Sequence, residues 1–151
     1  MAFEDGPFVQ VACFCETVLQ EVNGAHSLIR IIDTLIHTQT GPNPPKELPP
    51  FNYPLTMVLM FKSGMALGRS TLKVVPHLPT GETRDPLLLT IHFEGEEKGA
   101  NVTANITFPF EYEGVYWFKV YLTDPDEVAD KLMTAIPLRV KYNRVIAGQR
   151  L

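Results

Sequence analysis

Residues 113–124 read Glu113-Gly114-Val115-Tyr116-Trp117-Phe118-Lys119-Val120-Tyr121-Leu122-Thr123-Asp124. A turn glycine is followed by aromatic and β-branched residues, a composition typical of a β-strand. Side chains alternate between the two faces of a strand. One face therefore carries Tyr116, Phe118, Val120 and Leu122, and the other carries Val115, Trp117, Lys119 and Tyr121. The stretch predicts an all-β protein.

Further strands are predicted on both sides of this one. Residues 8–19 form an apolar strand, and Asn23-Gly24 then predicts a hairpin whose second arm spans residues 27–38. Residues 55–61 are continuously apolar, as expected for a strand covered on both faces. Alternation of apolar and polar residues predicts strands at residues 69–75, 87–94, 101–108 and 132–142. The prolines of residues 41–54 predict a stiff loop.

About eight evenly spaced strands predict a two-sheet antiparallel sandwich, immunoglobulin-like or similar, that forms a single domain over residues 1–151. One short helical turn is expected at residues 124–130, where Asp124 would be the N-cap and Pro125 the first helical residue.

The bulk composition narrows the function classes. The net charge is −4, and the 13 basic residues are scattered along the chain. A nucleic-acid surface needs clustered Lys and Arg, so no nucleic-acid partner is expected. The first residues carry Glu4 and Asp5 where a signal peptide needs basic residues, and no apolar run approaches the roughly 18 residues of a membrane helix. A cytoplasmic protein without a membrane partner is predicted.

Several motifs together resemble a family of uncharacterised bacterial single-domain β-sandwich proteins of unknown function. They are Glu21-Val22-Asn23-Gly24, the Pro-rich loop before a buried strand, Glu113-Gly114-Val115-Tyr116-Trp117-Phe118, and Ile136-Pro137-Leu138-Arg139-Val140. The resemblance implies the fold and assigns no catalytic residues. Residues 113–118 are also similar to a strand of immunoglobulin-like and fibronectin-like sandwiches, and this likeness implies a hydrogen bond from Tyr116 back to a loop backbone.

Cys13 and Cys15 are the first candidates for chemistry. On a strand the two thiols share a face with Cβ atoms roughly 7 Å apart, which is too far for an undistorted disulfide. A metal could bridge them with help from a histidine, but a four-coordinate site usually needs two further ligands and a wider spacing of the cysteines. Buried structural thiols are the favoured interpretation.

Catalytic arrangements are less well supported. Cys15 or Ser63 could pair with His77 or His92, yet neither nucleophile lies in a strained elbow motif. The acid groups Glu111 with Glu113, and residues 94–97, lie at predicted turns, where solvation explains them. No enzyme and no cofactor are predicted.

The outward face of the strand at residues 114–123 is the strongest candidate for a function. Val115, Trp117 and Tyr121 are apolar where a sandwich normally shows polar residues to solvent. A helix or the Pro-rich loop is expected to cover them, and a partner surface is the alternative. The polar row Asn101, Thr103, Asn105 and Thr107 would lie beside Trp117 if its strand formed a hairpin with residues 114–123, which would suit a polar ligand.

The sequence therefore predicts a non-enzymatic cytosolic binding or assembly module. Its partner would be another protein or further copies of the chain, bound through Val115, Trp117 and Tyr121. The alternative is a small-ligand or metal-binding protein that uses Cys13, Cys15 and a histidine.

Overall fold

A computed structural model describes residues 5–123 and 129–147 of the chain. Within these ranges every regular element is a β-strand. The strands are β1 (Phe8–Gln20), β2 (His26–Ile32), β3 (Thr34–Gly41), β4 (Phe51–Lys62), β5 (Leu67–His77), β6 (Leu87–Glu94), β7 (Gly99–Phe110), β8 (Gly114–Thr123) and β9 (Asp130–Ile146).

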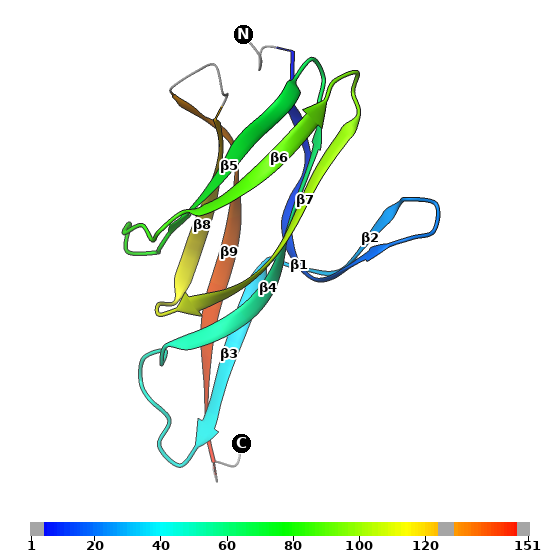
Figure 1. Ribbon diagram of the computed structural model, residues 1–151. Coiled ribbons are helices and arrows are strands. Elements are labelled where there is room, and N and C mark those ends of the chain that lie inside the picture. The colour runs from blue at the N-terminus through cyan, green and yellow to red at the C-terminus, as the bar shows by residue number, and fades with distance from the viewer. Residues whose placement is uncertain (1–4, 124–128, 148–151) are drawn as a thin grey trace.

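The strands form two sheets that pack face to face (Figure 1). One sheet has four strands in the order β2-β1-β4-β7, and the other has five in the order β3-β9-β8-β5-β6. The predicted all-β, two-sheet sandwich is confirmed, with nine strands rather than about eight. Of the helical turn predicted at residues 124–130, positions 124–128 lie outside the described residues, while Asp130 already belongs to β9.

An aromatic cluster joins the sheets at the centre of the core. The ring of Phe14 on β1 meets that of Phe118 on β8 edge to face, with centroids 4.8 Å apart. Phe108 on β7 reaches the same Phe118 ring at 5.2 Å. The inward face predicted for β8 is confirmed, because its side chains are all at most 1% exposed: Tyr116, Phe118, Val120 and Leu122.

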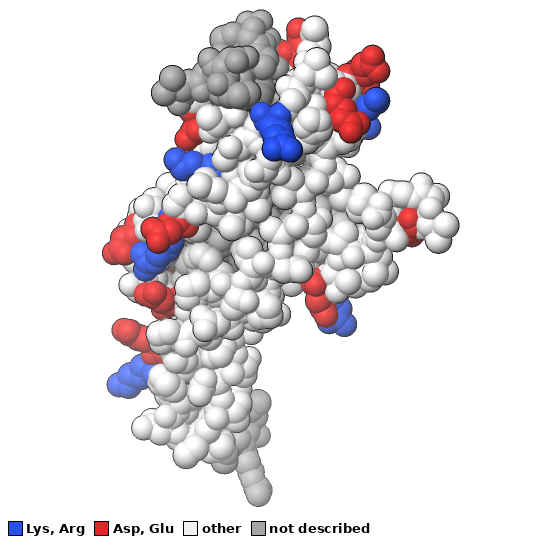
Figure 2. Space-filling view, in the orientation of Figure 1, with Lys and Arg blue, Asp and Glu red and all other residues white. Residues whose placement is uncertain are grey.

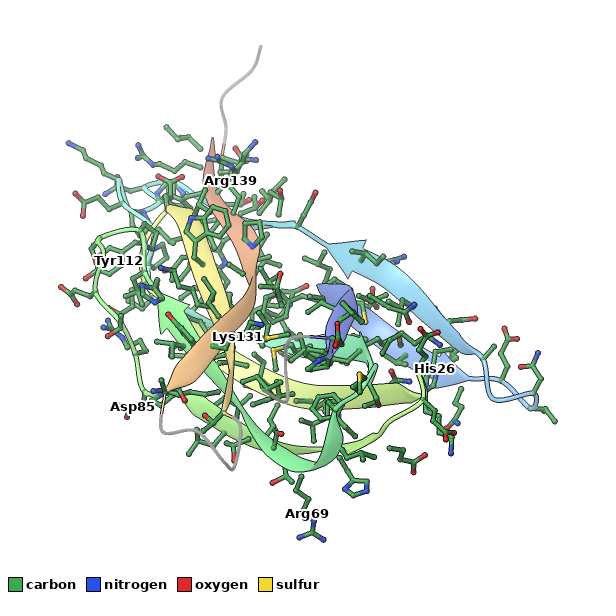
Figure 3. The ribbon with its side chains drawn as sticks, turned by 90° about the horizontal axis from the view of Figure 1, so that it is seen from above. His26, Arg69, Asp85, Tyr112, Lys131 and Arg139 are labelled. Carbon is green, nitrogen blue, oxygen red and sulfur yellow. The ribbon has the colours of Figure 1, made fainter. Side chains whose placement is uncertain are left out.

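The predicted hairpin at Asn23-Gly24 is confirmed. Its second arm was predicted as one strand over residues 27–38, but these residues form two strands, β2 and β3. In the turn, the Gly24 amide donates to the Glu21 carbonyl at 2.9 Å, and β2 pairs antiparallel with β1. Arg30 has a left-handed φ of 55°, and the strand then ends at Ile32. After Asp33 the chain passes to the other sheet as β3. The β1–β2 hairpin projects from the layers (Figures 1 and 3).

The sandwich is not wholly antiparallel. Strand β3 pairs parallel with β9, in a register that places Leu35 opposite Val140. The Arg139 amide also donates to the Asp33 carbonyl at 3.0 Å, so the pairing begins where β3 enters the sheet. The predicted sandwich was antiparallel, so this parallel pair is a departure from the prediction.

The predicted hairpin of β7 with β8 is wrong. Strand β7 lies at the edge of the four-stranded sheet, and β8 lies inside the five-stranded one. The turn between them is closed by the tyrosine that the likeness implied. The Tyr116 hydroxyl accepts from the amides of Glu111 at 3.1 Å and Tyr112 at 3.0 Å. It donates to the Tyr112 carbonyl at 3.2 Å, which confirms the bond back to the loop backbone.

The Pro-rich loop is shorter than predicted, since β4 already begins at Phe51. Pro54 is tolerated inside β4 because the pairing of β1 with β4 ends at Thr56, which leaves the earlier part of β4 paired only with β7. The loop lies against β9: the Tyr142 hydroxyl donates to the Pro45 carbonyl at 2.7 Å, and the Arg144 guanidinium donates to that of Pro44 at 3.0 Å.

Candidate binding surface

The outward face of β8 lies on the outside of the five-stranded sheet. Trp117 is 44% exposed at its centre, while Val115 and Tyr121 are half-buried by their neighbours. The expected covering by the Pro-rich loop is wrong. That loop contacts β9 at Tyr142 and Arg144, beyond the last pair of the β8–β9 ladder, so it lies past the end of β8.

Neighbouring strands complete the surroundings of Trp117. Pro137 of β9 is its ladder partner on one side, and His77 of β5 is its partner on the other. A shallow depression of about 340 Å³ opens beside the indole. It is lined by Asp33, Thr34, Val115, Trp117, Pro137 and Arg139. We call the outward-facing set of Val115, Trp117, Lys119, Tyr121, His77, Pro137 and Arg139 the Trp117 face.

The charges on this face are mostly positive. Lys119 follows Trp117 on the same side of β8, and Arg139 lies opposite Val115. Lys141 is two residues further along the same side of β9, so it extends the row of cations. The positive charge of Lys73 is offset by Asp130. The Lys73 ammonium donates to the Asp130 carboxylate at 3.2 Å. The Trp117 face is therefore aromatic and basic on a chain whose net charge is −4.

The pKa values of two groups in this region, His77 and Asp130, are lowered. Burial lowers the pKa of His77, and the charge of Lys119 lowers it further. Hydrogen bonds from Thr123 and then Lys73 lower the pKa of Asp130. His77 is thus biased towards the neutral imidazole and Asp130 towards the carboxylate, so neither adds to the positive charge that faces solvent near neutral pH.

The cysteine pair lies on the other sheet. Both thiols are free and share the outer face of β1, where Cys15 is buried and Cys13 half-buried. Burial raises the pKa of both thiols, which disfavours the thiolate that a metal needs. Among the described residues, no three His, Cys, Asp or Glu side chains come together in a way that could hold a metal. The described residues offer Cys13 and Cys15 no third metal ligand. Metal binding by the two cysteines therefore stays a prediction.

The polar row of β7 is not next to Trp117, which corrects the prediction. Asn101, Thr103, Asn105 and Thr107 are exposed as expected, but they lie on the outside of the four-stranded sheet. Asn105 accepts a hydrogen bond from Thr56 on β4 at 3.0 Å. The row therefore shares its face with the cysteines and is separated from the Trp117 face by the core.

The acids near the β7–β8 turn have structural partners. Glu113 accepts from the backbone amide of Tyr142 at 2.7 Å and so continues the contact between the β7–β8 turn and β9. Glu111 lies 3.6 Å from the guanidinium of Arg84. Both carboxylates thus have partners within the described part of the chain.

Sequence reasoning identified Val115, Trp117 and Tyr121 from the two-residue period of one strand. It missed His77, Pro137 and Arg139, which complete the same face. They come from β5 and β9, so only the register between strands brings them to Trp117. Spacing along the chain carries no signal for that register.

No family model matches the chain, and no curated protein matches it. The likeness to bacterial β-sandwich proteins therefore stays a prediction from the motifs. A search of the described residues for a helix of sufficient length and apolarity to cross a membrane finds none.

Proposed function

We propose that the chain is a non-enzymatic binding or assembly module of the cytosol, and that the Trp117 face is its contact surface. The observation that carries the proposal is the 44% exposure of Trp117 at the centre of this face. Tryptophan, tyrosine and arginine are the residues most enriched at the energetic centres of protein interfaces. Trp117 and Arg139 line the same depression, and Tyr121 lies four residues further along the same side of β8.

The charges favour a protein partner that presents carboxylates around an apolar anchor. Lys119 and Arg139 flank the indole and would pair with such groups, and the depression beside Trp117 would take the anchor. A symmetric contact of two Trp117 faces would set the cations of both copies against each other. Self-assembly through this face therefore requires a different, acidic surface on the second copy.

The groups with shifted pKa support binding over catalysis. Cys13 and Cys15 lie on β1, His77 lies on β5, Arg84 lies in the loop after β5, and Asp130 begins β9. Perturbed groups that work as an acid–base pair converge on one pocket. These groups lie on three strands of two sheets and in one loop, and not around one pocket.

The single tryptophan of the chain gives a direct test. Covering the face moves Trp117 away from water, so its fluorescence emission should shift to shorter wavelength on complex formation. For self-assembly, we expect this shift to grow with protein concentration in step with the mass measured by light scattering. A constant emission maximum and a constant monomer mass would exclude self-assembly through this face.

For a different partner, wild-type chain and Trp117→Ala are immobilised and the captured proteins are compared. Leu19→Ala, at an exposed apolar position of the β1–β2 hairpin, is the matched control. We expect a captured protein that Leu19→Ala retains and Trp117→Ala loses, and that shifts the Trp117 emission when purified and mixed. Equal capture by both variants, or saturable binding of single-stranded oligonucleotides to this face, would contradict the proposal.

A further inference from the structure

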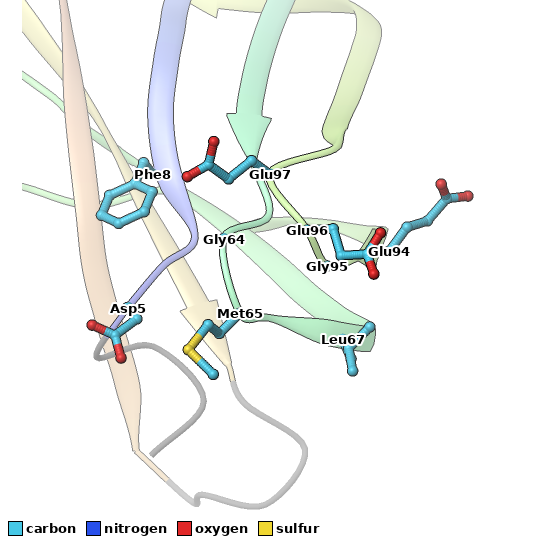
Figure 4. Close-up of a pocket in the computed structure, with 9 residues that line it drawn as sticks. All are labelled: Asp5, Phe8, Gly64, Met65, Leu67, Glu94, Gly95, Glu96 and Glu97. Atoms are coloured by element: carbon cyan, nitrogen blue, oxygen red, sulfur yellow. The ribbon is translucent and has the colours of Figure 1, made fainter.

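A groove lies at the end of the sandwich where β1 begins and the β4–β5 and β6–β7 loops meet. It has a volume of about 570 Å³. Three of its apolar side chains are strongly exposed: Phe8 at 54%, Met65 at 72% and Leu67 at 73%. Phe8 comes from the start of β1, Met65 and Leu67 come from the segment that leads into β5, and all three line the groove in Figure 4. We call this site the end groove.

Hydrogen bonds join the segments that line the end groove. Ser63 is fully buried, and its hydroxyl donates to the Lys98 carbonyl at 2.8 Å and accepts from the Glu94 amide at 3.3 Å. The amide of Met65 donates to the Asp5 carbonyl at 3.1 Å. The β4–β5 loop is thereby bonded to the N-terminal segment and to the β6–β7 loop. The exposed apolar side chains are held on a preorganised frame.

Two glycines make this closeness possible. Gly6 and Gly64 both have positive φ, at 126° and 58°. A Cβ on Gly64 would lie 2.2 Å from the Asp5 carbonyl oxygen, and one on Gly6 would lie 2.6 Å from that of Ser63. The backbones meet at a distance that no side chain would permit.

Carboxylates surround the apolar part of the groove. Asp5, Glu94, Glu96 and Glu97 all line it. Glu96 and Glu97 hold left-handed backbone conformations, with φ of 51° and 59°, which non-glycine residues rarely adopt. Figure 2 shows several acidic side chains at this end of the molecule, with basic side chains beside them. Two basic residues lie close by in the chain or the ladder: Lys98 directly follows Glu97, and Lys62 is the ladder partner of Phe8.

We propose that the end groove binds a basic, apolar polypeptide segment of another protein. Apolar side chains of the segment would contact Phe8, Met65 and Leu67, and its lysines or arginines would pair with the surrounding carboxylates. The same carboxylates would repel phosphates and anionic lipid headgroups, so a nucleic acid or a membrane surface does not fit.

The end groove is separate from the Trp117 face and opposite to it in charge. Strand β5 begins at Leu67 in the groove and ends at His77 beside Trp117. At about 3.3 Å per residue, these positions are roughly 30 Å apart. The chain thus has an acidic apolar site at one end of β5 and a basic aromatic site at the other.

The test measures fluorescence anisotropy of a labelled short peptide of alternating lysine and leucine with the full chain. Saturable binding is expected, with affinity that falls as salt rises. Peptide binding should weaken by about tenfold or more in the triple variant Glu94→Gln/Glu96→Gln/Glu97→Gln. Glu21→Gln/Glu47→Gln/Asp85→Asn removes the same charge at exposed positions elsewhere and should change it less than about twofold.

A second pair of variants tests the apolar part. Met65→Ser/Leu67→Ser should also weaken binding about tenfold, while Leu19→Ser/Val22→Ser on the β1–β2 hairpin should leave it unchanged. Thermal unfolding of each variant checks that the fold is retained. Trp117→Ala should bind the peptide normally, which separates this proposal from that for the Trp117 face.

Several results would overturn the proposal. Absence of saturable binding would do so, as would equal weakening by the groove and control variants, since the attraction would then follow net charge alone. Equally strong binding of a peptide with glutamate in place of lysine would exclude the role of the carboxylates. Binding of phosphatidylserine vesicles through Met65 and Leu67 would assign the groove to a membrane surface instead.

Discussion

The two faces of β8 are both rich in apolar side chains, but they differ in how far these side chains are exposed to solvent. On the inward face, Tyr116 and Phe118 are at most 1% exposed because β1 and β7 of the other sheet pack over them. On the outward face, Trp117 is 44% exposed. The difference lies in what the fold places opposite each face and not in the residues themselves. Among the described residues, no element packs over the indole of Trp117 as β1 and β7 pack over the inward face.

The largest expected contrast between the faces is in stability. Phe118→Ala leaves a cavity between Phe14 and Phe108 and should lower the free energy of unfolding by about 3–5 kcal/mol. Trp117→Ala, on the next residue, should lower it by about 1 kcal/mol or less, because the indole is already half in water. Urea unfolding measures both. Equal losses would show that the outward face is part of the core.

The next effect concerns the turn that leads into β8. Tyr116→Phe removes an oxygen that accepts from two backbone amides, and it leaves them without this partner inside the fold. We expect a loss of about 1–3 kcal/mol in the free energy of unfolding. Tyr121→Phe is the control on the outward face and should cost less than about 0.5 kcal/mol. If both changes cost the same, the hydroxyl of Tyr116 is not structural.

A smaller effect is expected at the outer end of the sheet, where Asp130 bonds Thr123 and Lys73. Because its folded pKa is lowered, its stabilisation is fully present above the unfolded value of about 3.9 and is lost as pH falls through the lower folded value. Asp130→Asn should therefore lower stability by up to about 1 kcal/mol at neutral pH and have no effect in strong acid. A difference that persists in acid would mean that packing is responsible.

The smallest effect concerns His77 beside Trp117. Its folded pKa is lowered, so the unfolded chain binds the proton first as pH falls below about 6.5, and stability declines there. Because the ring is near solvent, we expect a change below about 0.5 kcal/mol. Titration by NMR should show a rise in the His77 pKa in Lys119→Gln and none in Lys62→Gln. An unchanged value in Lys119→Gln would show that burial alone sets it.

Local patterns predicted much of the sandwich. The alternation in residues 114–123 identified the buried face of β8, and that in residues 87–94 gave the bounds of β6. Asn23-Gly24 identified its turn because this pair adopts the backbone conformation that a tight hairpin needs. Each of these depends on residues close together in the chain.

Two of the errors concern which strands meet. The arm at residues 27–38 is apolar throughout, so nothing in its pattern marks the change of sheet at Asp33. The same applies to β7 and β8, whose short connection suits a hairpin equally well. Strand partners are chosen by packing between distant segments, and the end groove, assembled from three such segments, left no signal in the sequence.

The parallel pairing of β3 with β9 also predicts an order of folding. The strands are separated in the chain by five others, and Arg144 bonds a carbonyl 100 residues earlier. Closing so long a loop is slow, because the chain entropy is lost before the contact is gained. During synthesis β3 leaves the ribosome long before its partner, and its edge stays open until β9 arrives. We expect the five-stranded sheet to close last, with a rate set by the search of β9 for β3.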